Sequence, residues 1–412
     1  MQDAQPGAQA NHGVDGPRIL YLGTTFPRYS ETFLQREVTF LRTQPLRLDV
    51  RSLWGGCGEF QGHHIPTSNL RNLPAALVSI PGWMVRKPEA FQQVLGTILG
   101  KRLPMVQNWL ENFWGFAWAL QHADTLLHQQ PHLIHATWGT MPAAAALALH
   151  VLTGLPYSME AHAYDVFKHG GDWLLEEKMR HAKFIRTSTR ATYNQLLKKG
   201  APRERLHLVR RGIKPSGEVR PEPVDGVPLR ILSVGRLVEK KDFSFQLEVF
   251  ERLAVNNFPF RAEIVGHGPM EARLQREAHR RGLDQHVAFL GRLDYPSVEQ
   301  AYLHADAFLF TGTTARNGDR DGLPNVIAEA MSHRLPVLSS PVPGALEAIE
   351  NLDTGFVLPK DVSAWAEALQ GLAQHPDLPT ICDNARNWVD ENFDICKNAL
   401  TLGNLLREHA CQ

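Results

Sequence analysis

The sequence predicts an α/β protein with two doubly wound domains, and three observations lead to this prediction. The chain has 412 residues, more than a single hydrophobic core usually organises. Short apolar strands alternate with amphipathic helices over residues 18–211, and the alternation starts again over residues 229–358. Residues 213–227 between them are rich in Pro and Gly, as inter-domain linkers are. We therefore expect a first domain over residues 18–212 and a second over residues 228–393.

The composition excludes several classes of protein. Hydrophobic residues make up 43% of the chain, too many for a disordered protein, and the zero net charge argues against nucleic acid as a partner. The four cysteines lack metal-binding spacing, so we expect free thiols and no metal site. No apolar run is long enough to span a membrane, and residues 1–17 look like a disordered tail rather than a signal peptide. We therefore expect a cytoplasmic protein.

The first domain begins with a buried strand over residues 18–23, which leads into a polar loop containing Thr25. Ser30 is a candidate N-cap for a helix that starts near Glu31. Loops after the strands of an open parallel sheet are where such sheets bind ligands. The pattern continues with strands at 47–53, 132–138, 156–161, 183–188 and 206–211, and with helices at 143–152, 173–181 and 191–199.

Residues 70–130 interrupt this pattern, and two interpretations are open. Four tryptophans lie among basic residues on apolar helical stretches: Trp83, Trp109, Trp114 and Trp118. Such helices suit a membrane interface, and any membrane contact is expected at residues 70–118. Alternatively, the aromatic residues form the core of a helical insertion. We favour the second interpretation because surface-binding helices usually show a cleaner charged face.

The second domain contains the stretch that carries the functional hypothesis, residues 306–347. A buried strand at 307–310 is followed by a polar loop and by Pro324, which suits the first position of a helix. The N–H groups at the start of a helix are unpaired and bind anions readily. Here they belong to Gly322, Leu323, Asn325 and Val326.

Two carboxylates flank this predicted anion site. Asp321 precedes the helix and Glu329 lies within it, so each could accept hydrogen bonds from hydroxyl groups on either side of a bound diphosphate. The alternative is that Asp321 caps the helix and Glu329 is an ordinary surface residue. The seven-residue separation, with GLPN and EAM, resembles the E-x7-E signature of the retaining GT-B glycosyltransferases of family GT4. The similarity continues through LPVLSS and the loop from Gly344 to Glu347, although the first acid here is Asp instead of Glu.

A basic turn after the strand at 229–235 fits the same hypothesis. Arg236 and Lys241 lie five positions apart, close enough for both to reach one diphosphate and to neutralise the charge that grows as it leaves. The segment resembles the GRL-x-x-x-KG element of GT4 enzymes, whose Arg and last Lys hold the donor phosphates. Asp242 replaces the usual Gly, and we rank Lys240 lower as a phosphate ligand.

Three further segments resemble GT4 elements. Gly266 and Gly268 match a G-x-G-P turn whose backbone approaches the nucleobase, and His162 matches the histidine of an AHA-x-D segment near the transferred sugar. FPRYSETF resembles the opening of exopolysaccharide and colanic-acid-type enzymes. His132 and His135 do not suggest a metal site, because residues three apart on a strand lie on opposite faces.

Together, the resemblance implies a GT-B fold, in which two Rossmann-like domains face each other across a cleft and residues 394–412 cross back to the first. It implies a metal-independent, retaining hexosyltransferase without a cofactor, which uses a UDP-sugar or GDP-sugar and acts on a saccharide or polyprenyl-linked saccharide in bacterial exopolysaccharide biosynthesis. Contact with the inner face of the plasma membrane is an accompanying hypothesis. The candidate residues are His162, Arg236, Lys241 and Asp321 for catalysis, Gly266, Gly268, Gly322, Leu323, Asn325, Glu329 and Gly344 for the donor, and Thr25, Ser30 and Glu31 on the acceptor side.

Two other functions remain open at this point. A non-hydrolysing nucleotide-sugar epimerase would consume the donor without an acceptor. A catalytically silent protein would bind the sugar nucleotide without turnover, which Asp321 and Asp242 make conceivable because both depart from the family pattern.

Overall fold

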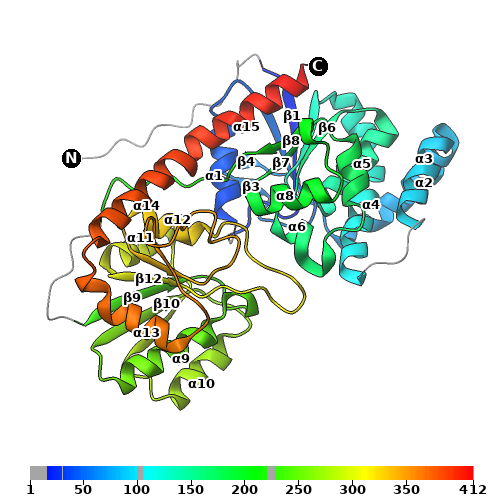
Figure 1. Cartoon of the computed structure of the whole chain (residues 1–412). Helices are drawn as coiled ribbons and strands as arrows, with labels where there is room; N and C mark the ends of the chain where they lie inside the picture. The colour runs from blue at the N-terminus through cyan, green and yellow to red at the C-terminus, as the bar shows by residue number, and fades with distance from the viewer. Residues whose placement is uncertain (1–15, 30, 100–104, 220–227, 412) are drawn as a thin grey trace. The chain divides into compact units, whose positions relative to one another are not determined.

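The computed structural model describes residues 16–29, 31–99, 105–219 and 228–411 (Figure 1). Most of the predicted tail, Ser30 and part of the predicted linker lie outside these ranges. The chain forms two compact units. Unit 1 comprises Met1–Glu160, His181–Phe184 and Ala399–Gln412, and unit 2 comprises Ala161–Arg180 and Ile185–Asn398.

The first sheet has the strand order β2-β1-β5-β6-β7-β8, and its described pairs are parallel. Its strands are short and largely buried, as expected for a sheet that is covered on both faces. They are β1 (Arg18–Gly23), β2 (Arg47–Ser52), β5 (Leu133–Ala136), β6 (Tyr157–Glu160), β7 (Ile185–Thr187) and β8 (Leu206–Leu208). A separate antiparallel hairpin, β3 (Glu59–Phe60) and β4 (His63–His64), follows β2.

The second sheet has the order β11-β10-β9-β12-β13-β14, and all its pairs are parallel. Relative to the chain this is the doubly wound order 3-2-1-4-5-6, whose switch point lies between the first and fourth strands, here β9 and β12. The strands are β9 (Leu229–Val234), β10 (Phe260–Val265), β11 (Val287–Gly291), β12 (Ala307–Phe310), β13 (Val337–Ser339) and β14 (Phe356–Val357).

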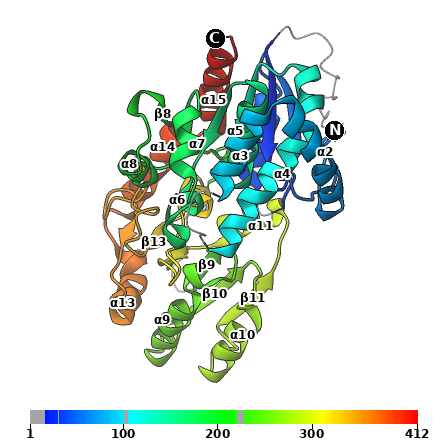
Figure 2. The ribbon, with the colours of Figure 1, turned by 90° about the vertical axis from the view of Figure 1, so that its right-hand side faces the viewer.

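Fifteen α-helices occur in the described ranges and connect or cover the strands (Figures 1 and 2). In the first half of the chain they are α1 (Thr32–Leu41), α2 (Leu73–Arg86), α3 (Pro88–Leu99), α4 (Val106–Gln129), α5 (Met141–Thr153), α6 (Ala163–Phe167), α7 (Leu175–His181) and α8 (Arg190–Lys198). The others are α9 (Phe243–Val255), α10 (Glu271–Arg280), α11 (Tyr295–His304), α12 (Asn325–Ser332), α13 (Val362–Gly371), α14 (Leu378–Asn392) and α15 (Ile395–Ala410).

The last helix contributes to the core of unit 1. Leu402 and Leu406 of α15 are completely buried in a cluster that includes Ile19 and Val38. The side chain of Gln44 donates a hydrogen bond from Nε2 to the carbonyl oxygen of Ala399 at 2.9 Å. The burial of these two leucines and this hydrogen bond thus attach α15 to the hydrophobic core of unit 1.

Three of the four tryptophans in the helical insertion are core residues. Trp83, Trp114 and Trp118 are almost fully buried, and each indole N–H donates a hydrogen bond. Their acceptors are the carbonyl oxygens of Leu120 and Leu53 and the hydroxyl of Ser68, at 2.7–3.0 Å. Since a buried Trp needs a partner for its N–H, these contacts fix α2 and α4 as part of a packed layer.

Two predictions at helix starts are wrong: the N-cap of α1 is Glu31 instead of Ser30, and Pro324 precedes α12 instead of occupying its first position. Helix α1 begins at Thr32, with Glu31 at the N-cap position. Helix α12 begins at Asn325, because Pro324 is extended (φ −68°, ψ 122°) and occupies the N-cap position. Because the proline ring fixes only φ, a proline can occupy either the N-cap position or the first helical position.

Candidate functional site

The candidate site lies in unit 2, where the chain leaves β9 and β12 at the switch point of the second sheet. The turn after β9 carries Arg236 and Lys241, and the loop after β12 carries Asp321. Hydrogen bonds join the two segments: the N–H of Thr313 donates to the carbonyl of Lys240 at 2.8 Å, and Thr311 Oγ1 donates to the carbonyl of Lys241 at 3.0 Å. Open parallel sheets bind ligands at this point of their topology.

A cluster of two lysines and two aspartates occupies the junction. Lys241 Nζ lies 2.7 Å from Asp321 Oδ2, and Lys240 Nζ lies 3.4 Å from Asp321 Oδ1 and 3.1 Å from Asp319 Oδ1. The side chains of Lys241 and Asp321 are only 13% and 18% exposed. Burial acts to raise the pKa of the Asp321 carboxyl, but the charges and hydrogen bonds of Lys241 and Lys240 outweigh it and lower this pKa.

Asp321 therefore does not cap helix α12, and that alternative is wrong. The N-cap position of α12 is taken by Pro324, and no side chain accepts a hydrogen bond from the first turn. Within the described residues, the N–H groups of Gly322, Leu323, Asn325 and Val326 donate to no acceptor. The start of α12 thus offers several hydrogen-bond donors and the positive end of the helix dipole next to the lysines.

Arg236 differs from the two lysines because its side chain is exposed. In the described part of the chain its guanidinium makes no hydrogen bond or ion pair. Lys241 Nζ also lies 4.9 Å from the centre of the Phe310 ring, a cation–π contact that helps to orient the ammonium. The turn after β9 thus holds one oriented cation and one that is available to a ligand.

Glycines allow the loops around this junction to approach one another closely. A Cβ on Gly344 would lie 1.8 Å from the carbonyl oxygen of Gly322, so the loop after β13 rests directly against the segment that leads into α12. A Cβ on Gly266, which has φ +135°, would lie 1.9 Å from the carbonyl oxygen of Gly235, and one on Gly268 would lie 2.5 Å from that of Leu237. Only glycine permits these backbone contacts.

The loop that carries Gly344 is also tied down by Glu347. Its Oε2 accepts a hydrogen bond from the N–H of Arg190 at 3.0 Å, and its Oε1 lies 2.7 Å from Arg210 Nη2. The Glu347 side chain is only 4% exposed. A buried carboxylate with both oxygens satisfied fixes the position of its loop, a role that the sequence did not predict.

Glu329 lies on α12, and its half-buried carboxylate accepts a hydrogen bond from the hydroxyl of Tyr302 in α11 at 3.2 Å. The hydroxyl also lies 3.5 Å from the carbonyl oxygen of Val326. Glu329 is therefore oriented by α11, and it is not the freely solvated surface residue of the alternative interpretation.

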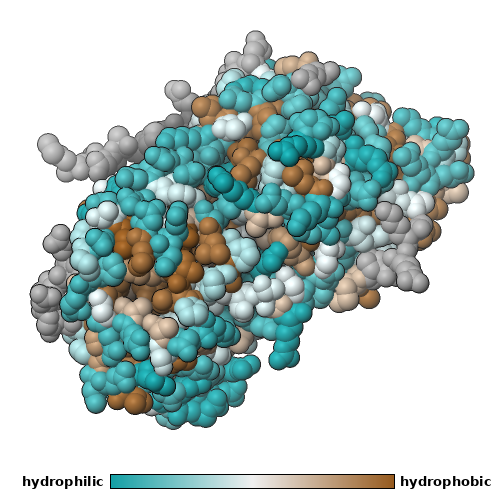
Figure 3. Space-filling model, in the orientation of Figure 1, coloured by the Kyte–Doolittle hydropathy of each residue, from teal (hydrophilic) through white to brown (hydrophobic). Residues whose placement is uncertain are grey.

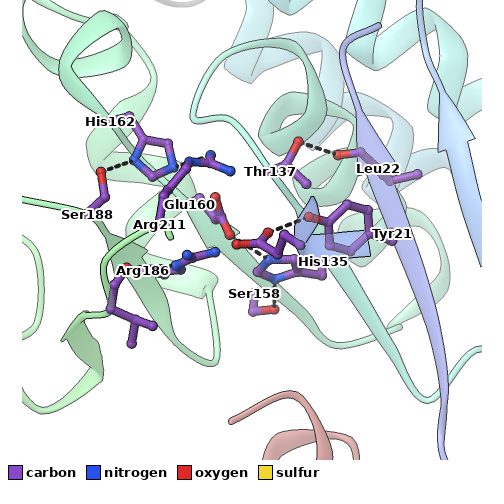
Figure 4. Close-up of polar contacts among 12 residues, drawn as sticks. Tyr21, Leu22, His135, Thr137, Ser158, Glu160, His162, Arg186, Ser188 and Arg211 are labelled. Carbon is purple, nitrogen blue, oxygen red and sulfur yellow. Dashed lines mark hydrogen bonds and ion pairs between the residues drawn. The ribbon is translucent and has the colours of Figure 1, made fainter. Parts of the chain in front are cut away.

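Figure 4 shows both ring nitrogens of His162 engaged within the protein. Nε2 lies 2.8 Å from Arg211 Nη2, and Nδ1 lies 3.1 Å from Ser188 Oγ. Arginine can only donate, so Nε2 accepts and the proton of the neutral ring lies on Nδ1, where it donates to Ser188. The His162 N–H also donates to Asp165 Oδ2 at 2.8 Å, which fixes the start of α6. Arg211 was missed in the sequence because it lies 49 residues away.

Asp242 adds no free negative charge to the site, because it pairs with Lys360. Its φ of +49° is in the left-handed region, which explains why a Gly is suited to this position. Both residues line a small pocket beside Thr311, Thr313 and Ser340. In the orientation of Figure 1, Figure 3 shows hydrophobic residues gathered where β12 and α12 are labelled.

The acceptor-side candidates belong to unit 1. Thr25 Oγ1 donates to the carbonyl oxygen of Trp54 at 2.8 Å, and Glu31 Oε1 lies 3.3 Å from Arg28 Nη1. Ser30 lies outside the described residues. The structure thus gives Thr25 a local structural partner, and it assigns neither residue to a ligand.

Comparison with known proteins establishes the family. The model for glycosyl transferases group 1 matches residues 219–388, which include the lysine–aspartate cluster and α12, and the model for the glycosyl transferase 4-like domain matches residues 71–212. The chain is a GT4-type glycosyltransferase. The resemblance found in its motifs and the predicted GT-B fold are thereby confirmed.

This glycosyltransferase has relatives in polysaccharide biosynthesis. It is 27% identical over 398 residues to the amylovoran biosynthesis glycosyltransferase AmsK of Erwinia amylovora, a match that covers 92% of this chain and 96% of AmsK. It is 32% identical over 204 residues to the putative colanic acid biosynthesis glycosyltransferase WcaL of Escherichia coli (strain K12), which covers 48% of this chain and 50% of WcaL.

Solved structures show the same fold. HepE of Anabaena, in complex with UDP-glucose, superposes with a TM-score of 0.69 at 18% identity, covering 95% of the GT4-type chain and 99% of HepE. Sucrose-phosphate synthase of Thermosynechococcus elongatus gives a TM-score of 0.73 at 16% identity, covering 95% and 98% of the two chains.

Two features are absent from the described residues of the glycosyltransferase. No helix there is both long enough and apolar enough to cross a membrane. No group of three or more His, Cys, Asp or Glu side chains there is arranged to hold a metal ion.

Proposed function

We propose that this glycosyltransferase moves a hexose from a UDP-sugar or GDP-sugar to a saccharide or polyprenyl-linked saccharide, with retention of configuration and without a metal ion. The observation that carries the proposal is the pairing of Lys241 with Asp321 at 2.7 Å beside the unpaired N–H groups of α12. The UDP-glucose complex of HepE and the biosynthetic role of AmsK support the donor class and the pathway of polysaccharide assembly.

In the proposed reaction, the bond from the anomeric carbon to the diphosphate breaks while a bond to the acceptor oxygen forms on the same face. The acceptor proton passes to an oxygen of the leaving diphosphate, so no protein nucleophile is required. Negative charge develops on the diphosphate, and Arg236, Lys241 and the start of α12 stabilise it. Fixed donors of this kind need no reorganisation during the reaction, which is the source of their effect.

Asp321 has a dual role in this proposal. In the described structure its carboxylate neutralises Lys241 and Lys240. When a diphosphate binds Lys241 instead, the carboxylate is released and accepts hydrogen bonds from hydroxyls of the donor sugar. Glu329, held by Tyr302, accepts hydrogen bonds on the other side of the diphosphate.

The remaining candidates complete the proposed site. Gly266 and Gly268 bring the turn after β10 against the turn after β9, and we assign the nucleobase to this backbone. His162 contacts the transferred sugar, with Arg211 as the residue that positions its ring. Thr25, Ser30 and Glu31 belong to the acceptor side. When the acceptor is lipid-linked, residues 70–118 contact the inner face of the membrane.

The test is a panel of nucleotide sugars screened by thermal shift, followed by turnover of the best donor with saccharide acceptors. We expect acceptor-dependent release of the nucleoside diphosphate, a product with the donor's anomeric configuration by NMR, and activity that persists in EDTA. Arg236→Met is expected to lower kcat by roughly 10²–10³ without changing Tm, whereas Arg261→Met, an exposed arginine on β10, leaves both unchanged. Donor consumption without an acceptor would indicate an epimerase, and binding without turnover a silent protein.

A further inference from the structure

Arg320 lies in the loop after β12, directly before Asp321, and its guanidinium stacks on an aromatic ring. The central carbon of the guanidinium, Cζ, lies 3.5 Å from the centre of the Phe167 ring in α6, which corresponds to close stacking. Arg320 is half-buried, and both α6 and this loop belong to unit 2. A stacked guanidinium keeps its N–H donors at its edge, where a ligand can approach in the same plane.

Backbone contacts hold the Arg320 loop against the segment that contains Phe167. The N–H of His169 donates a hydrogen bond to the carbonyl oxygen of Asn317 at 2.8 Å. A Cβ on Gly318, which has φ +80°, would lie 2.8 Å from the carbonyl oxygen of Phe167, so this close approach requires glycine. These contacts give Arg320 a fixed position relative to α6.

No anion in the described part of the protein compensates the charge of Arg320. Within the described residues its guanidinium makes no ion pair and no hydrogen bond, and burial lowers its pKa without a carboxylate that acts to raise it. Two other cations of this region differ, because Lys240 pairs with Asp319 at 3.1 Å and the Arg316 side chain is 98% exposed to water. Removing water from an unpaired charge costs free energy, so the state of Arg320 is explained by an anionic group on a ligand.

The surroundings of Arg320 indicate which part of a ligand it meets. On one side is Asp321, to which the proposed function assigns hydroxyls of the donor sugar. On the other is α6, whose N-cap residue is His162, assigned to the transferred sugar. The diphosphate has cations of its own in Arg236 and Lys241. Arg320 is therefore placed to meet a negative group on a sugar, and the fork of a guanidinium matches a carboxylate through two parallel hydrogen bonds.

We propose that Arg320 is a specificity-determining residue that binds the carboxylate of an acidic sugar, so that one of the two sugars joined by this glycosyltransferase is a hexuronic acid. The carboxylate belongs either to the sugar of the donor or to the terminal sugar of the acceptor, since both lie at the bond that forms. Phe167 supplies the flat surface that orients the guanidinium, and Arg320 donates the hydrogen bonds. This assignment rests on the proposed function, which leaves the charge of both sugars open.

Paired donors test the first source of the carboxylate. Calorimetry compares UDP-glucuronic acid with UDP-glucose and GDP-mannuronic acid with GDP-mannose, because the members of each pair differ only in the carboxylate. For a donor carboxylate we expect Arg320→Met to raise the Kd of the acidic donor by roughly 10- to 150-fold, as for the loss of one charge-assisted contact. The Kd of the neutral donor is expected to stay unchanged. Arg316→Met, in the same loop, is the matched control and keeps both wild-type values.

Paired acceptors test the second source. Disaccharides that end in glucuronic or galacturonic acid are compared with those that end in glucose or galactose, in steady-state transfer from the preferred donor. For an acceptor carboxylate we expect Arg320→Met to raise the KM of the acidic acceptor by the same factor and to leave donor Kd unchanged. Arg320→Lys keeps the charge without the fork, so we expect an intermediate loss that is confined to the acidic sugar.

Two further measurements separate the outcomes. The Tm of Arg320→Met is expected to be unchanged, since methionine keeps an apolar contact with Phe167, and its affinity for free UDP or GDP is expected to equal that of the wild type. If the wild type binds neither nucleoside diphosphate, the proposed function fails, and the assignment of Arg320 fails with it. If one binds and its sugar is transferred, but Arg320→Met affects the acidic and neutral members of every pair alike, the proposed function stands and the assignment of Arg320 is overturned.

Discussion

Asp321→Asn tests whether the carboxylate and Lys241 form a functional ion pair. The substitution keeps the shape of the side chain and removes only its charge. At 2.7 Å, with an effective dielectric constant of about 20, the Coulomb attraction is roughly 6 kcal/mol. Desolvation of two side chains that are only 13% and 18% exposed offsets much of it. We expect a net loss of about 1–3 kcal/mol at neutral pH, between the values typical of exposed and buried pairs.

The loss depends on pH in a defined direction. Because the two lysines lower the pKa of Asp321 in the folded state, the carboxylate stabilises the fold above the ordinary carboxyl pKa near 3.8. That contribution disappears as the pH falls through the lowered pKa. The difference between wild type and Asp321→Asn is therefore expected to be complete above about pH 5 and to shrink below about pH 4.

Thermal unfolding at a series of pH values is the assay. For a unit of the size of residues 161–180 and 185–398, 1 kcal/mol corresponds to about 2–4 °C in Tm, so we expect a decrease of about 2–12 °C near pH 7. Asp377→Asn, at an exposed position before α14, is the control and should leave Tm unchanged. A decrease that is the same at every pH would refute the charge-based explanation.

The same variant separates the two roles proposed for Asp321. Since the carboxylate competes with a diphosphate for Lys241, Asp321→Asn is expected to bind free UDP at least as tightly as the wild type does. Turnover of the nucleotide sugar is expected to fall, because the contact with the sugar hydroxyls is lost. Weaker binding of free UDP by the variant would contradict this division.

Two further substitutions probe the geometry around α12. Gly344→Ala places a Cβ 1.8 Å from the carbonyl oxygen of Gly322, so the loop must move. We expect the free energy of unfolding to fall by about 1–3 kcal/mol and calorimetry to show weaker donor binding. Unchanged values of both would show that the close approach of the two loops is not required. Glu329→Ala is expected to weaken donor binding more than Tyr302→Phe does, because Tyr302 only orients the Glu329 carboxylate. If Glu329→Ala and the wild type bind the donor equally well, Glu329 does not belong to the donor site.

Much of the fold was predictable because its signals are local. The parallel strands of unit 2 are short apolar runs between turn residues, and this pattern predicts β12 at its observed bounds, Ala307–Phe310. The apolar spacing also predicts the helix after GLPN, with a start at Pro324 that is one residue before the observed one. The resemblance of two motifs to GT4 elements places Lys241 and Asp321 in one predicted donor site, and the structure pairs their side chains.

The contacts that set the charge of the site were not predictable, because they join distant parts of the chain. Lys240 pairs with Asp319 only because the loop after β12 folds back over the turn after β9. Asp242 pairs with Lys360, 118 residues away, so its charge could not be judged from its neighbours. No local pattern announces such pairs, since each residue alone resembles any solvated charge.

The helical insertion illustrates a different limit. Trp83 and Val85 are both apolar residues of α2, yet the first is buried and the second is 82% exposed. The helix has too few polar residues for its periodicity to reveal which side is covered. The sequence therefore indicates that the tryptophans are core residues, but it does not distinguish the exposed aliphatic side of α2 from the buried one.

Calorimetric titration of the preferred nucleotide sugar into wild type and Lys241→Met measures the proposed diphosphate site most directly. A charge-assisted contact to a phosphate contributes about 1.5–3 kcal/mol, so we expect Kd to rise by roughly 10- to 150-fold. Lys198→Met, at an exposed position on α8, is the matched control and is expected to keep the wild-type Kd. Equal donor affinity in wild type and Lys241→Met would contradict the placement of the diphosphate at the start of α12.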